Sequence, residues 1–224
     1  MAIALVTSVS QGGAGASSGV DTTGATLLVA GCSAQTISAG LSDNKSNTWT
    51  QIGTTLTQPG AFNQQVAFYY VNGTPIVGPG HTFTCGDVTP AVAMLAFNAT
   101  AITSALDQSS QAADQSSPAQ AGSITPGVDN EVLVFLCGGF NGTGGSVDLG
   151  FTLQENVLGD AGSNYSIDLS YLVETTAAAK NPGLTYDNVR SQGCFLSSFK
   201  AAGGGGATSP FPPFEHHTQT VWRM

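Results

Sequence analysis

Short apolar runs separated by turn-forming residues recur along most of the chain. Gly, Asn, Asp, Ser and Pro interrupt the runs, a pattern typical of β-strands joined by turns. No segment combines an apolar repeat of helical period with capping residues. The pattern predicts strands near residues 2–9, 25–33, 47–53, 65–72, 80–85, 91–98, 131–139, 147–156, 164–175, 183–186 and 191–200. The Ser/Gln/Ala-rich residues 101–120 are expected to form a long connection, with at most a short strand or turn.

Many short strands of this kind predict an all-β fold, here a two-sheet jelly-roll-like β-sandwich, because each sheet must bury one face. Apolar and polar side chains alternate over residues 165–171, which predicts a strand with its Ser166, Asp168 and Ser170 face in water. Residues 25–30, 91–97 and 132–137 are instead apolar on both faces. Long loops or another subunit must cover them, and the extent of apolar surface favours a subunit interface and a homo-oligomer.

The composition changes sharply after Lys200. We expect a sandwich at residues 1–200, a Gly-rich linker at 201–210 and an aromatic C-terminal arm at 211–224. Prolines favour an extended backbone, and large aromatic groups on a segment too short to bury them are frequent binding anchors. The sequence therefore predicts either a disordered tail or, as we prefer, a docking arm that contacts a neighbouring subunit or a particle lattice. The docking residues are expected to be Phe211, Pro212, Pro213, Phe214 and Trp222.

Charged residues are scarce. Asp, Glu, Lys and Arg make up 8% of the chain against 41% hydrophobic residues, and the formal net charge is −9. The basic residues are scattered, so we expect no nucleic-acid binding. No apolar stretch is long enough for a membrane span, and the N-terminus lacks the regions of a signal peptide. A polar, uncharged, Gly-rich chain without an export signal fits a protein made in a host cytoplasm and later exposed on a virus particle.

The catalytic and metal-binding patterns in the chain are all incomplete. Residues 15–19 read G-x-S-x-G but lie in a Gly/Ser loop between two strands, not at a strand-to-helix turn. His81 has no nucleophile or acid marked beside it, so we interpret it as a strand-edge histidine. His216 and His217 are adjacent and make a poor chelate. We therefore expect a non-enzymatic protein without a metal ion or cofactor.

Two further patterns favour structural interpretations. Residues 43–47, DNKSN, have a superficial likeness to a calcium loop but lack its Gly and its distal Glu, so a tight turn explains them better. For glycosidase-type chemistry, nothing in the sequence marks a carboxylate pair. The glutamates are Glu131, Glu155, Glu174 and Glu215.

The cysteines are far apart in sequence and lie in or beside apolar runs. Cys32, Cys85, Cys137 and Cys194 form no metal or redox motif, and buried free thiols are the preferred interpretation. One cross-strand disulfide remains open, between a pair that the sequence does not select. Among the aromatic residues, Trp49 is expected in the core. Tyr69 could face outward and contact a glycan.

Several segments, in order, resemble a family of jelly-roll, lectin-like sandwich domains. Residues 42–51, SDNKSNTWTQ, resemble the family's S-D-x-x-G-N-T-(Y/W)-T hairpin, with Ser46 in place of the usual Gly. Further likenesses are AFYYV at 67–71, HTFTC at 81–85, VAMLAFNA at 92–99, LD at 106–107, NEVLVF at 130–135 and FLSSFK at 195–200. Phe97 and Asn98 depart from the family's Glu-Tyr-Ser style, and the aromatic arm is additional. The resemblance spans about residues 20–200.

The resemblance implies a sandwich with an exposed structural or binding role, since such domains occur in phage virion proteins and bacterial surface proteins. The family pattern carries no catalytic motif that transfers to this chain. We therefore expect a phage virion structural protein, an external capsid decoration or head-fibre subunit. Its arm would attach it to another virion structural protein of the capsid or tail. The alternative is a carbohydrate-binding adhesin module that recognises host glycans.

Overall fold

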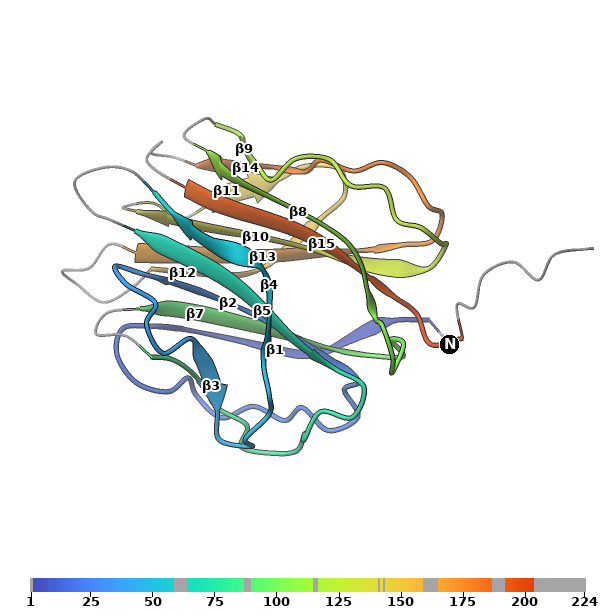
Figure 1. Ribbon diagram of the computed structural model, residues 1–224, viewed down its shortest axis with the longest axis horizontal. Helices are drawn as coiled ribbons and strands as arrows, with labels where there is room; N and C mark the ends of the chain where they lie inside the picture. Colours follow the sequence, from blue (N-terminus) through green and yellow to red (C-terminus); the bar gives the residue numbers. More distant parts are fainter. Residues whose placement is uncertain are drawn as a thin grey trace, which may run out of the picture.

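Figure 1 shows the protein as a computed structural model, which describes residues 2–58, 64–86, 90–114, 117–140, 142, 144–158, 165–186 and 192–203. The described residues contain β-strands and no helix. The strands are β1 (Ala4–Gly12), β2 (Leu27–Ala34), β3 (Leu41–Asp43), β4 (Thr50–Thr57), β5 (Gln65–Asn72), β6 (Phe83–Cys85), β7 (Ala91–Asn98), β8 (Leu106–Asp114), β9 (Ala119–Gln120), β10 (Glu131–Phe140), β11 (Gly144–Val147), β12 (Thr152–Leu158), β13 (Tyr165–Glu174), β14 (Gly183–Tyr186) and β15 (Gln192–Lys200).

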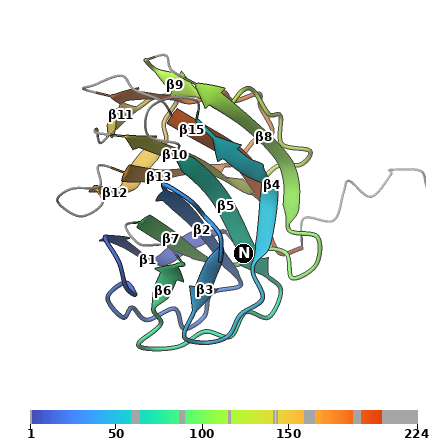
Figure 2. The same ribbon diagram turned by 60° about the vertical axis from the view of Figure 1, so that its left-hand side comes forward.

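Two large antiparallel sheets form the body, and two small sheets accompany them. The large sheets have the strand orders β1-β7-β2-β5-β4 and β12-β13-β10-β15-β8. The small sheets are β3-β6 and β11-β14-β9. In both views the small sheets lie on opposite outer sides of the two large ones (Figures 1 and 2). The predicted all-β two-sheet sandwich is confirmed.

The two halves of the chain repeat one topology. Reading the second large sheet from its other edge gives β8-β15-β10-β13-β12, which matches β1-β7-β2-β5-β4 strand for strand. Strands β3 and β6 of one small sheet correspond to β11 and β14 of the other, so only β9 lacks a counterpart among the described strands. Each half inserts its last strand between its first two long strands, a jelly-roll-like connection. The sandwich is therefore built from two structural repeats, packed through their large sheets.

The strand register supports the repeat at the level of residues. Leu27 of β2 pairs with Phe97 of β7, and Val132 of β10 pairs with Phe199 of β15. Two positions further along, Val29 lies opposite Tyr70 of β5, and Val134 lies opposite Tyr171 of β13. The repeat is not apparent from the sequence because few matched positions keep the same residue.

The inner faces of the large sheets enclose the main core, which contains Leu27, Val29, Phe68, Leu95, Phe97, Val134, Leu136, Ile167, Phe195 and Phe199. The two sheets pack closely at Gly31 of β2. A Cβ atom there would lie 1.9 Å from Cδ1 of Leu136 and 2.6 Å from Cδ1 of Ile167. Leu136 occupies the position in β10 that Gly31 occupies in β2, by the pairing of both strands with their neighbours. A small residue in one repeat thus accommodates its larger counterpart in the other.

The chain itself covers the outer faces of both large sheets. Leu28 and Cys32 of β2 pack in one apolar cluster with Leu41 of β3 and Phe83 of β6. Leu133, Phe135 and Cys137 of β10 pack in another with Ala119 of β9 and Leu184 and Tyr186 of β14. Strands that are apolar on both faces therefore need no second subunit to cover them. Homo-oligomerisation stays a prediction, but exposed apolar strands no longer support it.

The prediction of a wet face on β13 is wrong. Ser166, Asp168 and Ser170 are at most 2% exposed, because the small sheet with β14 lies over them. The Tyr186 hydroxyl donates a hydrogen bond to Oδ2 of Asp168 at 2.8 Å. Burial raises the pKa of Tyr186, so this phenol stays protonated and keeps its donor.

The open edges of the two large sheets meet along both sides of the sandwich. Ser10 of β1 donates a hydrogen bond to Oε2 of Glu155 in β12 at 2.6 Å. On the other side, Oε1 of Gln111 in β8 accepts the backbone N–H of Thr54 in β4 at 2.9 Å.

Strand β8 occupies residues expected to form a connection. Its alternation is too weak to predict because its side chains are polar on both faces.

Both chain ends of the described body lie at one end of the sandwich (Figure 1). The backbone N–H of Ala4 donates to Oδ1 of Asn98 at 3.0 Å. The N–H of Ala202 donates to the carbonyl of Ala99 at 2.7 Å. The predicted linker began at residue 201, but Ala201 and Ala202 still belong to the hydrogen-bonded body. Residues 204–224, with the predicted arm, lie outside the described residues.

Candidate functional site

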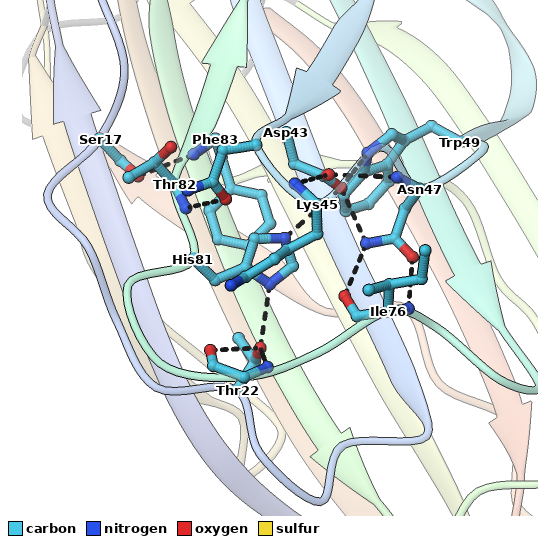
Figure 3. A network of polar contacts seen from close by, with 12 residues as sticks. Ser17, Thr22, Asp43, Lys45, Asn47, Trp49, Ile76, His81, Thr82 and Phe83 are labelled. Carbon is cyan, nitrogen blue, oxygen red and sulfur yellow. Dashed lines mark hydrogen bonds and ion pairs between the residues drawn. The ribbon is translucent and has the colours of Figure 1, made fainter.

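A polar network joins three loops beneath the small sheet of the first repeat (Figure 3). The loops contribute Thr22, the turn that follows Asp43, and the segment from Ile76 to His81. Strands β3 and β6 position the network, because Asp43 ends β3 and pairs with Phe83 at the start of β6.

Asp43 is the acceptor at the centre of the network. Its Oδ1 accepts the backbone N–H groups of Lys45 at 2.8 Å and of Asn47 at 3.2 Å. Its Oδ2 accepts the Asn47 side-chain amide at 3.0 Å and Nε1–H of Trp49 at 2.9 Å. The first two bonds are those of an Asx-type turn, and Ser46 adopts a positive φ of 61°. The predicted tight turn is confirmed, and N–H donors occupy both oxygens that a calcium ion would need.

His81 lies between Asp43 and Thr22 and is completely buried. Its Nδ1 is 2.9 Å from Oγ1 of Thr22, its Nε2 is 3.5 Å from Oδ2 of Asp43, and its ring packs against Phe83. A proton on Nε2 faces the carboxylate, whereas a lone pair there would be repelled, so the neutral Nε2–H tautomer fits this site. Burial lowers the pKa of His81 and outweighs the opposing effect of Asp43.

Thr22, His81 and Asp43 stand in the order of a nucleophile, a base and an acid. A catalytic hydroxyl must reach a substrate, but Thr22 is 0% exposed. Its hydroxyl oxygen also accepts the N–H of Gly78 at 3.1 Å. Through these contacts the three side chains hold the loops together, so their role is structural. Sequence reasoning missed it because Thr22 and Asp43 are remote from His81 along the chain and no local motif links them.

Asn47 extends the network to the surface. Its side chain accepts the N–H of Ile76 at 2.6 Å and donates to the carbonyl of Ile76 at 2.9 Å. Both backbone groups of Ile76 are therefore fixed, while its side chain is 55% exposed. Lys45 adds a hydrogen bond to the carbonyl of Pro79 at 3.1 Å. The network thus sets the path of residues 76–81 across the outer face.

Tyr69 lies on the outer face of its sheet, but the chain covers it there, so it is not the surface residue that was predicted. Its side chain is 7% exposed and packs with Cys32 and Cys85 beneath the small sheet of the first repeat. Burial raises the pKa of its hydroxyl. A buried ring offers no stacking surface for a sugar. Trp49, which was predicted in the core, is half-buried and packs against this cluster, with its ring edge-on to Phe83 at 6.0 Å.

The cysteines divide into two pairs. Cys137 of β10 and Cys194 of β15 are cross-strand partners joined by a disulfide, whereas Cys32 and Cys85 are buried free thiols. The preferred interpretation holds for the second pair, and the disulfide left open by the sequence is found in the first. Burial raises the pKa of Cys32 well above its ordinary value, which keeps this thiol protonated.

The remaining predicted site residues have separate outcomes. Phe211, Pro212, Pro213, Phe214 and Trp222 of the docking arm, with His216 and His217, lie outside the described residues. Among the residues that the structure describes, no group of three or more His, Cys, Asp or Glu side chains could hold a metal ion. No helix in the described part of the chain is long and apolar enough to cross a membrane.

Comparisons with protein-family models, curated proteins and solved structures found no match.

Proposed function

We propose that this protein is a non-enzymatic structural protein of a phage virion. It decorates the outside of the capsid, or forms a head-fibre type of subunit, and is attached through its C-terminal arm. The observation that carries the proposal is the closed body. Each large sheet is covered on its outer face by the chain's own small sheet, and the polar network around His81 is buried. A body that buries its own apolar faces in this way suits a subunit that stands exposed to water on the outside of a particle.

The position at which the chain leaves the body supports an attachment role for the arm. Hydrogen bonds fix the chain as far as Ala202, at the end of the sandwich that also holds the N-terminal strand. A run of four glycines then precedes Phe211, Phe214 and Trp222. An arm anchored at one end would leave the opposite end of the sandwich facing outward. Any self-association of the subunits would also run through the arm.

The proposal is tested with virions of the phage that encodes the chain. Full-length protein should co-sediment with purified particles, whereas a chain truncated after Gly203 should stay soluble and keep its β-sheet circular dichroism. Replacing Phe211, Phe214 and Trp222 by serine should also release the protein from particles, since aromatic anchors supply most of such a docking energy. Replacing Thr218, Gln219 and Thr220 by alanine is the matched control and should leave attachment intact.

Attachment of the truncated chain at the full-length level would overturn the proposed role of the arm. A glycan array probed with residues 1–203 separates the proposal from an adhesin. We expect no specific signal, because Tyr69 is buried. Strong binding to one glycan would favour the carbohydrate-binding function instead.

A further inference from the structure

A lysine and two carboxyl groups meet on three neighbouring strands of the second large sheet. Lys200 ends β15, Asp107 lies near the start of β8, and Glu131 begins β10. Nζ of Lys200 is 2.8 Å from Oδ1 of Asp107. The other oxygen of Asp107, Oδ2, accepts the backbone N–H of Gly127 at 2.7 Å. Glu131 is the cross-strand partner of Lys200, and its carboxyl group is close enough to that of Asp107 for each to influence the other's pKa.

The two carboxyl groups differ in environment. Glu131 is 0% exposed, its Oε1 accepts the N–H of Val128 at 3.3 Å, and its buried Oε2 has no donor within hydrogen-bond geometry. Burial raises the pKa of Glu131, and the neighbouring Asp107 adds to the rise against the opposing effect of Ser198. Burial alone would raise the pKa of Asp107 too, but hydrogen bonds from Lys200 and Gly127 lower it overall. The arrangement is therefore an ion pair beside a buried carboxyl group that holds its proton more readily than an ordinary glutamate.

The fold does not require this cluster. The first repeat has Asn98 where the second has Lys200, and Thr26 where the second has Glu131, by the matching pairs in the registers. These positions are uncharged. Asn98 accepts the N–H of Ala4, and the Thr26 hydroxyl is 2.8 Å from that of Thr100. The same end of the sheet is thus built without a lysine or a carboxyl pair in the other half of the molecule.

We propose that Lys200 and Asp107 condense into an intramolecular isopeptide bond, with Glu131 as the catalytic acid and base. A primary amine held against a carboxyl carbon is placed for acyl transfer, since proximity supplies much of the activation free energy. The Gly127 N–H points at the oxygen on which negative charge develops, as a donor in an oxyanion hole does. Glu131, buried beside the pair, is placed to supply in its acid form the proton that the leaving oxygen needs.

The reaction balances without a co-reactant. The Lys200 ammonium transfers one proton to Asp107 across their hydrogen bond, leaving a neutral amine and a neutral acid. The amine lone pair forms a bond to Cγ of Asp107, and the charge on Oδ2 is stabilised by the N–H of Gly127. Glu131 protonates Oδ1, which leaves as water, and its carboxylate then takes a proton from the new amide nitrogen. One ammonium and one carboxylate become one amide and one water, with nothing oxidised or reduced.

The hydrogen bond to Asp107 raises the pKa of Lys200, so the ion pair is the major form and the neutral pair is the minor form from which the reaction starts. The product would join the last strand to the first strand of the second repeat. Lys200 lies three residues before Gly203, the last described residue of the body. A covalent bond there would transmit force from the arm into two strands instead of one.

Intact mass spectrometry of the full-length chain tests the inference. The protein is incubated after purification, then reduced and alkylated so that the Cys137–Cys194 disulfide does not contribute to the mass. We expect the loss of one water from the sequence mass. Trypsin should no longer cleave after Lys200, and residues 46–180 should be recovered joined to the peptide that contains Lys200.

Two variants keep the fold and remove the chemistry. Lys200→Arg preserves the ion pair but has no nucleophilic amine, and Glu131→Gln cannot transfer the proton; both should retain the full sequence mass. Lys180→Arg is the matched control, because Nζ of Lys180 lies 2.7 Å from Oε2 of Glu174 in an ordinary ion pair. It should lose one water as the wild type does. A wild-type chain that keeps its full mass, with normal cleavage after Lys200, would show that the cluster is an ion pair only and overturn the inference.

Discussion

At the residue scale, Asp43 organises more of the described structure than any other single side chain of the first repeat. Its two oxygens accept hydrogen bonds from Lys45, Asn47 and Trp49, and its Oδ2 faces His81. The side chain is 0% exposed, so water cannot replace these bonds. A buried donor that loses its acceptor costs more free energy than the hydrogen bond contributes.

Replacing Asp43 by alanine should therefore destabilise the fold strongly. The Trp49 N–H and the amides of Lys45 and Asn47 would lose their acceptor, and we expect the free energy of unfolding to fall by about 3 kcal/mol. Urea unfolding followed by Trp fluorescence measures this. Asp21→Ala is the control, because Asp21 makes a similar bond to the Thr23 N–H at an exposed turn and should change stability little. Equal effects of both variants would contradict the central role of Asp43.

The lowered pKa of His81 makes a pH-dependent contribution to stability. The ordinary pKa is 6.5, and the folded value lies below it. Between the two values the unfolded chain binds more protons, so stability is complete above 6.5 and falls as the pH drops toward the folded pKa. The slope is at most about 1.4 kcal/mol per pH unit.

Unfolding free energies of the wild type and of His81→Gln, compared from about pH 7.5 to pH 5, isolate this contribution. The wild type should lose stability toward acid faster than the variant. Glu131, His216 and His217 are present in both proteins, so their effects cancel. Parallel curves would show that His81 is not linked to folding.

At the scale of the elements, the close approach of β2 and β10 depends on one small residue. Gly31→Ala would place a methyl group against Leu136 and should cost about 1–3 kcal/mol of stability. Leu136→Ala alone should cost about 2–5 kcal/mol through the cavity it leaves. In the double variant the methyl group enters that space, so the loss should be less than the sum of the two. Additive losses, measured by urea unfolding, would contradict the proposed fit between the repeats.

The sequence predicts the long strands well, since apolar runs and turn residues mark β2, β5, β7, β10, β13 and β15. It does not predict what lies on their outer faces. The short strands β3, β9 and β11 carry no periodic signal, so the small sheets that cover those faces could not be foreseen. For the same reason, the sequence alone predicts Ser166, Asp168 and Ser170 in water and a second subunit over the apolar strands.

For the candidate site, the sequence predicts contacts between neighbouring residues but not contacts between residues far apart in the chain. The turn after Asp43 follows from its Asp, Asn and Ser residues, because their side chains bond to nearby backbone groups. The partners of His81 and the cluster of Lys200 with Asp107 and Glu131 arise from strand pairing across long sequence separations. Only the register of the second sheet brings these three side chains together.

At the scale of the whole molecule, covered outer faces make the body self-sufficient. A chain truncated after Gly203 should therefore be monomeric at micromolar concentration, in contrast to the subunit interface that the apolar strands suggested. Size-exclusion chromatography with light scattering, run beside the full-length chain, tests this. Oligomers of the truncated chain would mean that an exposed face of the body associates. Oligomers of the full-length chain alone would assign association to the arm.

A cryo-electron microscopy map of the virion tests the proposed function most directly. We predict external density of the size of the two-repeat sandwich. That density should join the particle through the end that holds Asn98, Lys200 and Gly203, with density for the aromatic arm inserted into the neighbouring protein. A particle that lacks this density, or a body attached through its opposite end with a free arm, would rule out the proposed function.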